Sequence, residues 1–206
     1  LVEPTVTKTF VTNPILTGGT SVLRIVITNP NTTGAGNTIT GISFSDTYPA
    51  GLVNAATPNA TITGGSCSGG TLVAVPGGNS ISLSGAQITA TAAADTCTID
   101  VTVTAAAAGA YFNSTGSITT SNTPPQTAPA TATLNVLSPP TITKSFVPSS
   151  IASGGTSTLT IVIANPGTNP INLTGVSFAD VFPTTPGAMT LAAPLTTSNT
   201  CTAGST

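Results

Sequence analysis

The sequence carries very little charge. Its 206 residues include three basic and five acidic side chains, so charged residues make up 4% of the chain, against about 25% in an ordinary soluble domain. Three basic side chains are too few to follow a phosphate backbone, which excludes nucleic acid as a partner. They also leave no basic patch for a membrane surface. Because no apolar run approaches the ~20 residues of a membrane-spanning helix, we expect no membrane insertion in this segment.

Histidine and tryptophan are absent. Without an imidazole the chain cannot build a Ser/His/Asp or Cys/His nucleophile, nor a histidine metal site. Asp95 and Asp100 could be paired carboxylates only if they converged in a cleft, and we interpret them as surface acids. The lack of tryptophan leaves a poor stacking platform for sugars. We therefore predict a protein that is not an enzyme, with no catalytic, cofactor-binding or metal-ligating residue.

The residues that are present favour β structure. Threonine alternates with apolar residues, as in Thr102-Val103-Thr104, which is the period-2 pattern of a strand with one face buried. Helical spacing does not persist, and clusters of Gly, Pro and Asn separate the alternating segments. Many short strands at this spacing indicate an antiparallel sandwich. The segments with the pattern are residues 5–11, 20–29, 39–47, 70–75, 80–84, 96–104, 111–120 and 130–137.

The sequence also repeats itself. Residues 4–11 (PTVTKTFV) match residues 140–147 (PTITKSFV), GGTS follows in both copies, and TGISFSD at 40–46 matches TGVSFAD at 174–180. We predict the tail of a preceding repeat at 1–3, a complete repeat at 4–138 and the N-terminal half of a second repeat at 139–206. The strands that the second copy lacks are expected from downstream sequence or from a neighbouring chain.

These strings closely resemble the tandem Ig-like conserved-repeat domains, of uncharacterised function, in large bacterial and archaeal cell-surface proteins. The resemblance covers the first repeat and the part of the second that is present. It implies an all-β fold of tandem immunoglobulin-like antiparallel β-sandwiches, with the second copy incomplete in this chain. It also implies use as a stalk, adhesin or envelope-fibre module, and it brings no catalytic residue.

The cysteines fit the repeat. Cys67 and Cys97 lie in the first copy, and Cys201 takes the position of Cys67 in the second. We interpret them as one disulfide per repeat, Cys67 to Cys97, with Cys201 paired beyond the visible end; a cysteine pair at these places also recurs in the family that the chain resembles. Buried free thiols are the alternative, and a metal site would lack its other ligands. Disulfides persist in oxidising compartments, so we expect a secreted, extracellular or cell-surface protein.

Half of the charged side chains form a repeated pair: Lys8 with Asp46, and Lys144 with Asp180. In its strand, each of the four has the parity of neighbouring core residues, so its side chain is expected to point inward. An unpaired charge there would be costly, so each lysine should meet its aspartate in a buried ion pair.

A spontaneous isopeptide bond at Lys8 is the alternative, because Asn29 and its repeat Asn165 also have core-side parity and complete a Lys/Asn/Asp set. The expected hairpin register argues against it. A fold about the intervening Gly-Gly turn places Lys8 near Leu23, and a second hairpin fold, about Gly34, places Asp46 near the same height. Asn29 is then roughly 20 Å away at ~3.4 Å per residue. We expect Asn29 to organise the Asn-Pro turn instead.

The most economical function is structural: a repeat module of an exported surface stalk, adhesin shaft or extracellular filament, with copies of itself as partners. A largely neutral, hydroxyl-rich exterior permits such packing because little charge repels it. The alternative is an adhesin module that binds a glycan or a host protein through its loops. Glycosylation is a further hypothesis, although in a chain rich in Asn and Thr several sequons arise by chance. The sequons lie at Asn31, Asn59, Asn113 and Asn172.

Overall fold

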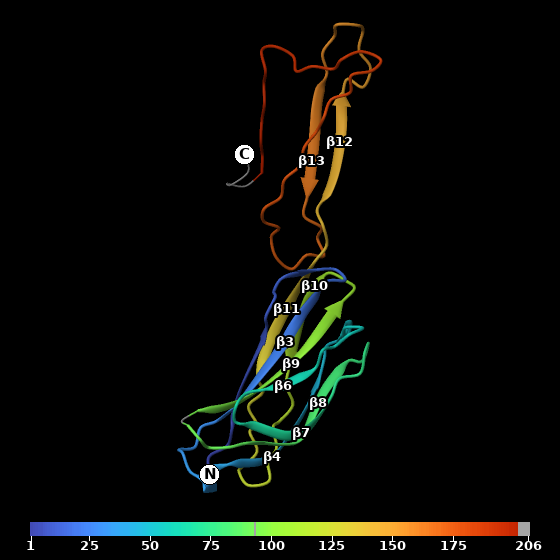
Figure 1. Cartoon of the computed structure of the whole chain (residues 1–206). Coiled ribbons are helices and arrows are strands. Elements are labelled where there is room, and N and C mark those ends of the chain that lie inside the picture. The colour runs from blue at the N-terminus through green and yellow to red at the C-terminus, as the bar shows by residue number, and fades with distance from the viewer. Residues whose placement is uncertain (93, 202–206) are drawn as a thin grey trace. The chain divides into compact units, whose positions relative to one another are not determined.

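The structure, a computed structural model, describes residues 1–92 and 94–201. The described chain is all-β apart from one short 3-10 helix, η1 (Ala35–Asn37), and its strands can be followed in Figure 1. It divides into two compact units. The first consists of Leu1–Pro139 with Asn165–Asn172, and the second of Pro140–Ala164 with the described part of Leu173–Thr206.

The first unit contains a five-stranded antiparallel sheet. The central strand β3 pairs with β9 along its whole length, from Thr20 opposite Thr104 to Asn29 opposite Asp95. Beyond them the order is β1-β3-β9-β5, and β6 also pairs with β9. The bounds are β1 (Thr5–Phe10), β3 (Thr20–Asn29), β5 (Leu52–Asn54), β6 (Thr61–Thr63) and β9 (Asp95–Ala105).

Two three-stranded sheets complete the first unit, in the orders β4-β8-β7 and β10-β11-β2. The chain that follows β10 runs along β4, with Thr119 opposite Ser43, and so connects these two sheets. β2 is parallel to β11, and the other pairings are antiparallel. The bounds are β2 (Ile15–Leu16), β4 (Ile39–Thr47), β7 (Cys67–Val73), β8 (Ser80–Ile88), β10 (Gly109–Ser114) and β11 (Thr131–Leu137).

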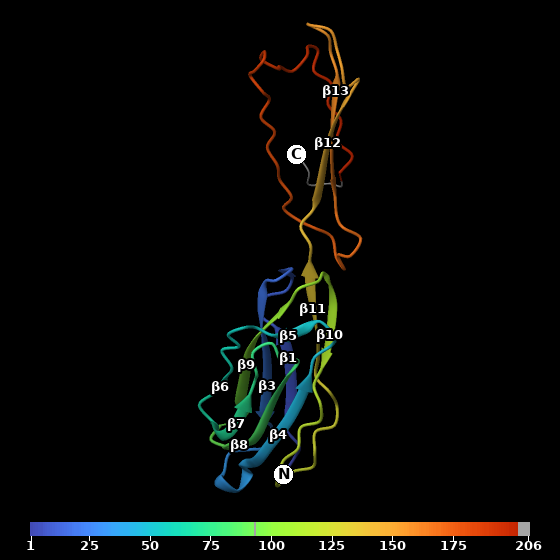
Figure 2. The same ribbon diagram turned by 90° about the vertical axis from the view of Figure 1, so that its right-hand side faces the viewer.

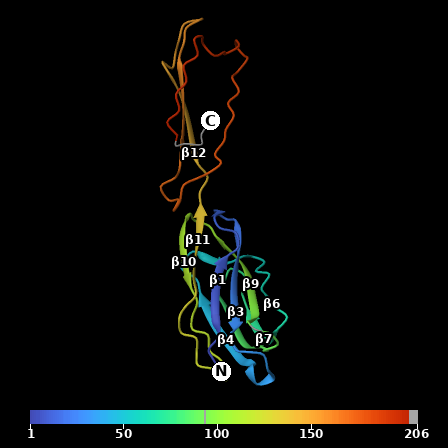
Figure 3. The ribbon, with the colours of Figure 1, turned by 90° about the vertical axis from the view of Figure 1, so that its left-hand side faces the viewer.

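One core lies between these sheets. β3 and β9 bury every second residue, as the threonine alternation predicts, and β4 and β8 contribute buried apolar residues to the same cluster. Each fully buried aliphatic side chain contributes about 1.5–3 kcal/mol relative to exposure. Figures 2 and 3 show this unit from opposite sides. The largest buried side chains are Leu23, Ile25, Ile27, Ile39, Ile42, Leu52, Ile81, Leu83, Ile88, Ile99, Ile118 and Leu134.

The second unit contains the hairpin β12 (Thr141–Val147) and β13 (Thr158–Ala164). Its register repeats that of β1 and β3: Lys144 is opposite Ile161 as Lys8 is opposite Ile25. No strand is assigned in the described chain after β13. The described residues include no helix with the length and apolar character to cross a membrane.

The fold corrects the expected neighbours of Lys8 and Asp46. Lys8 lies opposite Ile25 rather than Leu23, a shift of two residues that keeps the inward parity. β4 does not form a hairpin with β3, because the chain crosses through η1 to the other side of the core and β4 pairs with β8. The strands β2 and β5 were not predicted, because two or three residues are too few to show an alternation. β6 has the threonine alternation, in Thr61-Ile62-Thr63, but was not among the predicted segments.

Candidate functional site

An ion pair crosses the core of the first unit. Lys8 comes from β1 and Asp46 from β4, which lie in different sheets. The Lys8 Nζ donates a hydrogen bond of 2.6 Å to Asp46 Oδ2, and both side chains are 0% exposed. Both residues have inward parity in their strands, so both side chains point into the core and can contact each other there. Lys8 and Asp46, which recur as Lys144 and Asp180 in the second copy, are thus in direct contact in the structure.

A third residue joins the pair, and sequence reasoning missed it in this role. Asn113 of β10 is 1% exposed, and its Nδ2 donates a 3.3 Å hydrogen bond to the same Asp46 Oδ2. Asp46 Oδ1 and Asn113 Oδ1 have no hydrogen-bond partner among the described residues. The parity of β10 is hard to infer from sequence because Phe112, the aromatic neighbour, is 60% exposed. Asn113 was noted only as a sequon, and its burial leaves no room for a glycan in the folded unit.

Burial dominates the electrostatics of this cluster, which we call the Lys8 cluster (Lys8, Asp46 and Asn113). Desolvation lowers the pKa of Lys8 and raises the pKa of Asp46, against the smaller opposing effect of their mutual attraction. Burial, together with the charge on Asp46, also raises the pKa of Tyr48. Both shifts in the pair favour the uncharged forms. Transfer of the proton from Lys8 to Asp46 would give a neutral amine, which is a nucleophile.

The corresponding pair in the second unit lies in a more open environment. Lys144 Nζ is 2.7 Å from Asp180 Oδ1, and the two side chains are 38% and 24% exposed. The ammonium group also lies 5.6 Å from the centroid of the Phe146 ring, a favourable cation–π contact. Asn165 belongs to the first unit, where its amide donates to the backbone oxygen of Ile171. The second pair is therefore partly solvated.

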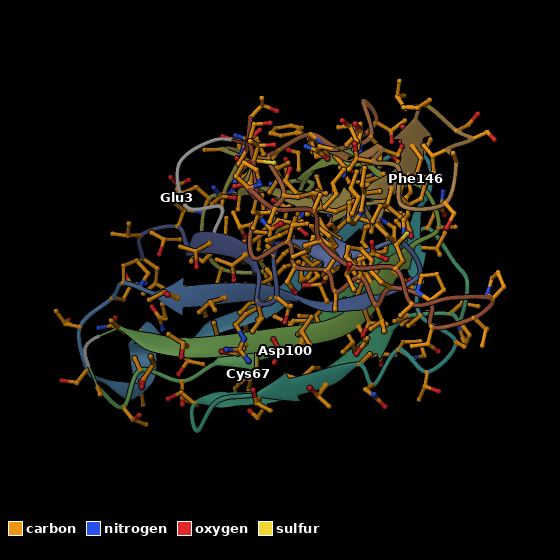
Figure 4. All side chains as sticks on the ribbon, turned by 90° about the horizontal axis from the view of Figure 1, so that it is seen from above. Glu3, Cys67, Asp100 and Phe146 are labelled. Atoms are coloured by element: carbon orange, nitrogen blue, oxygen red, sulfur yellow. A yellow bond between two sulfur atoms is a disulfide. The ribbon has the colours of Figure 1, made fainter. Side chains whose placement is uncertain are left out.

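A disulfide between Cys67 and Cys97 ties β7 to β9. Cys67, labelled in Figure 4, begins β7, and Cys97 lies on the core side of β9. The two Cα atoms are 4.9 Å apart, and the residues are 30 positions apart in the sequence. Because β7 and β9 lie in different sheets, the bond links the two sides of the sandwich. Cys201 is exposed and has no disulfide partner within the described residues.

Asn29 and Asn31 stabilise the turn at Asn29-Pro30 through their hydrogen bonds, and the partners of Asn29 do not include Lys8 or Asp46. The Asn29 Nδ2 donates to the backbone oxygens of Asn37 and Ile88, and its Oδ1 accepts from Asn31. Asn31 in turn exchanges two hydrogen bonds with the backbone of Val2, at 2.9 and 3.2 Å.

The second copy has the same arrangement. Asn169 donates to Asn165 Oδ1 and exchanges two hydrogen bonds with the backbone of Ser138, at 2.7 and 3.0 Å. Asn169 lies four positions after Asn165, whereas Asn31 lies two positions after Asn29. The different spacing hides this repeated backbone clamp from sequence comparison.

Asp95 and Asp100 also have structural partners. Asp100, labelled in Figure 4, receives two hydrogen bonds from Arg24, at 2.8 and 2.7 Å, on the outer face of the sheet. Asp95 accepts from the Ser66 hydroxyl and from backbone and side-chain donors at Thr91 and Ala92, which lowers its pKa to about 2. Asp95 is therefore more than a surface acid, because it organises the turn before β9.

Solved structures with similar folds include a cohesin module of a family 33 glycoside hydrolase from Clostridium perfringens ATCC13124, with a TM-score of 0.46 and 10% identity over 67% of this chain and 99% of the cohesin. The pilus backbone RrgB of Streptococcus pneumoniae aligns with a TM-score of 0.42 and 15% identity, over 59% of this chain and 32% of RrgB. The major pilin subunit BcpA of Bacillus cereus aligns with a TM-score of 0.43 and 12% identity, over 69% of this chain and 42% of BcpA. At these identities the likeness is one of fold alone.

No curated protein matches the chain. One family model matches nearly all of it, in two segments, residues 4–136 and residues 140–206. Both segments begin at the proline that opens each copy of the internal repeat. The chain therefore belongs to the family described as domain of unknown function DUF7933.

Proposed function

We propose that this chain is a structural repeat module of an exported surface stalk, adhesin shaft or extracellular filament, and that it has no catalytic role. The proposed modules are residues 4–138 and 139–206, with residues 1–3 ending a preceding module. Their relation to tandem Ig-like repeats of bacterial and archaeal cell-surface proteins is part of the same proposal.

The main observation behind the proposal is that both copies contain the same strand hairpin and the same lysine–aspartate ion pair. β12 and β13 have the register of β1 and β3, and each copy pairs its lysine with its aspartate at a similar distance. A chain that repeats a whole strand pair and its internal ion pair is typical of modules arranged in tandem. Such modules add length to a fibre without requiring a new fold.

The use of charge also supports a structural role. All three basic side chains, Lys8, Arg24 and Lys144, form ion pairs with aspartates of the same chain. The side-chain cations are therefore all paired within the chain, so few uncompensated charges remain on the exterior. Such a surface lets copies of the chain pack against one another with little electrostatic repulsion.

The disulfide supports export. A bond between Cys67 and Cys97 persists in an oxidising compartment and would be reduced in most cytosols. An extracellular or cell-surface location follows from the proposal, and the partners are other copies of the module.

Negative-stain microscopy of surface material from producing cells, labelled with an antibody against this chain, tests the proposal. We expect fibres that carry the label at regular axial intervals. Label confined to the tips of isolated flexible chains would contradict a shaft role and favour an adhesin module that binds a glycan or a host protein.

A further inference from the structure

The Lys8 cluster brings together three strands that are distant in the sequence. Lys8 lies on β1, Asp46 on β4 and Asn113 on β10. Lys8 Nζ and Asn113 Nδ2 both hydrogen-bond to Asp46 Oδ2, at 2.6 and 3.3 Å, so the amine and the amide meet at one carboxylate oxygen. Nucleophile, acyl group and proton carrier are thus held in one place by the fold, which removes most of the entropic barrier to their reaction.

We propose that Lys8 and Asn113 become joined by an intramolecular isopeptide bond, in a reaction that Asp46 promotes by moving protons. Asp46 Oδ2 takes a proton from the Lys8 ammonium, and the neutral amine attacks Asn113 Cγ. The bond from Lys8 Nζ to Asn113 Cγ forms, the bond from Cγ to Nδ2 breaks, and Nδ2 leaves as ammonia after receiving a proton through Asp46. The ion pair and the amide become one new amide, a protonated Asp46 and one ammonia, so atoms and charge balance without a further reactant.

Burial gives the reaction its driving force. The starting cluster holds an ammonium and a carboxylate, both with fully buried side chains, and desolvation makes such a pair expensive. The product contains no charge, because the proton that Lys8 gives up remains on Asp46 and the amine has become part of a neutral amide. The lowered pKa of Lys8 and the raised pKa of Asp46 act in the same direction, toward the neutral amine and the neutral acid.

Two unpartnered oxygens are also consistent with this reaction. Asn113 Oδ1 is buried and accepts no hydrogen bond from the described residues, and neither does Asp46 Oδ1. A buried carbonyl oxygen without a donor is unfavourable in a resting structure. When the amine attacks, negative charge develops on Asn113 Oδ1, and a proton on the nearby carboxyl of Asp46 can stabilise it.

The bond would tie the first strand of the repeat to β10. In a stalk, tension that enters at β1 would pass directly to β10, and the chain between residues 8 and 113 would not extend. This mechanical consequence rests on the proposed function, whereas the bond itself does not.

Peptide mapping of the full chain tests the proposal, after reduction of the disulfide and denaturation. Trypsin cleaves after lysine and arginine, which occur only at Lys8, Arg24 and Lys144. An amidated Lys8 resists cleavage, so we expect the fragment 1–24 to remain covalently attached to the fragment 25–144, with the mass of one ammonia missing. Fragmentation should place the link between Lys8 and Asn113.

Release of a free 1–8 fragment in full would overturn the proposal, because Lys8 would then carry an unmodified amine. A link from Lys8 to Asp46 with loss of water would overturn it too, since Asp46 would be the acyl donor. A succinimide at another asparagine also removes ammonia, but it leaves Lys8 open to trypsin, so the map separates the two.

Matched variants test the roles. We expect Asp46→Ala to slow the cross-link about 100-fold or more, the usual contribution of a positioned acid or base, and Asn113→Ala to abolish it. Lys144→Ala is the control and should leave the link intact. Formation of the Cys67–Cys97 disulfide reports whether each variant folds, and an Asp46→Ala chain that folds and still cross-links at the original rate would overturn the role of Asp46. If a variant does not fold, the map of the unchanged chain still decides whether the bond exists.

Discussion

The two units contain the same lysine–aspartate pair in different surroundings. In the first, both side chains are fully buried and an asparagine from β10 contacts the carboxylate. In the second, the pair is partly exposed and lies beside Phe146. The hairpins have equivalent registers, so the local sequence is not what separates them. The surroundings differ because, in the first unit, opposing strands close over the pair.

This difference shows that an ion pair has no fixed energetic value. Water screens the Lys144 pair, whereas the Lys8 pair lies in a medium of low polarity, where loss of one partner leaves a charge without compensation.

The largest expected effect comes from Asp46→Ala, which leaves the Lys8 ammonium buried and unpaired. We expect the first unit to lose about 3–5 kcal/mol, and an isopeptide bond would add to that loss. Asp180→Ala should change the second unit by only about 0–1 kcal/mol. Hydrogen exchange measured by mass spectrometry reports opening of β1 and of β12 in the same sample. Equal losses in the two units would contradict the comparison.

A double variant, Lys8→Met with Asp46→Leu, serves as the control. It removes both charges and keeps apolar volume, so it should be clearly more stable than Asp46→Ala alone. A double variant as unstable as the single one would mean that packing, and not the unpaired charge, causes the loss.

Removal of the disulfide should have the next largest effect. Cys67→Ala with Cys97→Ala opens a loop of 30 residues, which should destabilise the first unit by about 3–4 kcal/mol. Urea denaturation followed by tyrosine fluorescence measures this, because Tyr48 and Tyr111 both lie in the first unit. Cys201→Ala, which removes the exposed cysteine of the second copy, should leave the midpoint unchanged; an equal shift would show that the bond is not what stabilises the unit.

Loss of the backbone clamp should have a smaller effect. Asn31→Ala removes both hydrogen bonds to Val2 and the side-chain donor to Asn29 Oδ1, which keeps only the hydrogen bond from the backbone N–H of residue 31; the loss should cost about 1–3 kcal/mol. Asn169→Ala makes the matched change at Ser138. We expect faster hydrogen exchange at Val2 and at Ser138 respectively, each confined to its own variant. Unchanged hydrogen exchange at both amides would show that these asparagine side chains do not stabilise the backbone at Val2 and Ser138.

The smallest effect should come from Asp95, whose partners are neutral donors. Its folded-state pKa of about 2 lies below the unfolded value of about 3.9. The carboxylate therefore contributes stability that is fully present above pH 3.9 and is lost as the pH falls toward 2. Acid titration of the first unit should show this loss, and Asp95→Asn should flatten that part of the curve. An unchanged curve in the variant would assign the acid sensitivity to another group.

The alternation of threonine and apolar residues was enough to predict most of the longer strands of the first unit. The parity of Lys8 and Asp46 predicted that both point into the core, and this does not depend on which strands pair. The neighbours of those residues were harder to predict. The expected hairpin between β3 and β4 does not form, and Asn113 contacts Asp46 from a strand 67 positions further along the chain.

The sequence by itself determined the strand alternation, the repeat, the inward direction of Lys8 and Asp46 and the scarcity of charge in the rest of the chain. These are properties of short segments, where the face of a side chain follows from its parity. Only the tertiary structure decided that an amide meets the first pair and that the second pair remains partly solvated. Contact between sheets depends on which strand crosses the core, and burial depends on what closes over a residue. Neither is encoded within the segment that carries the charge.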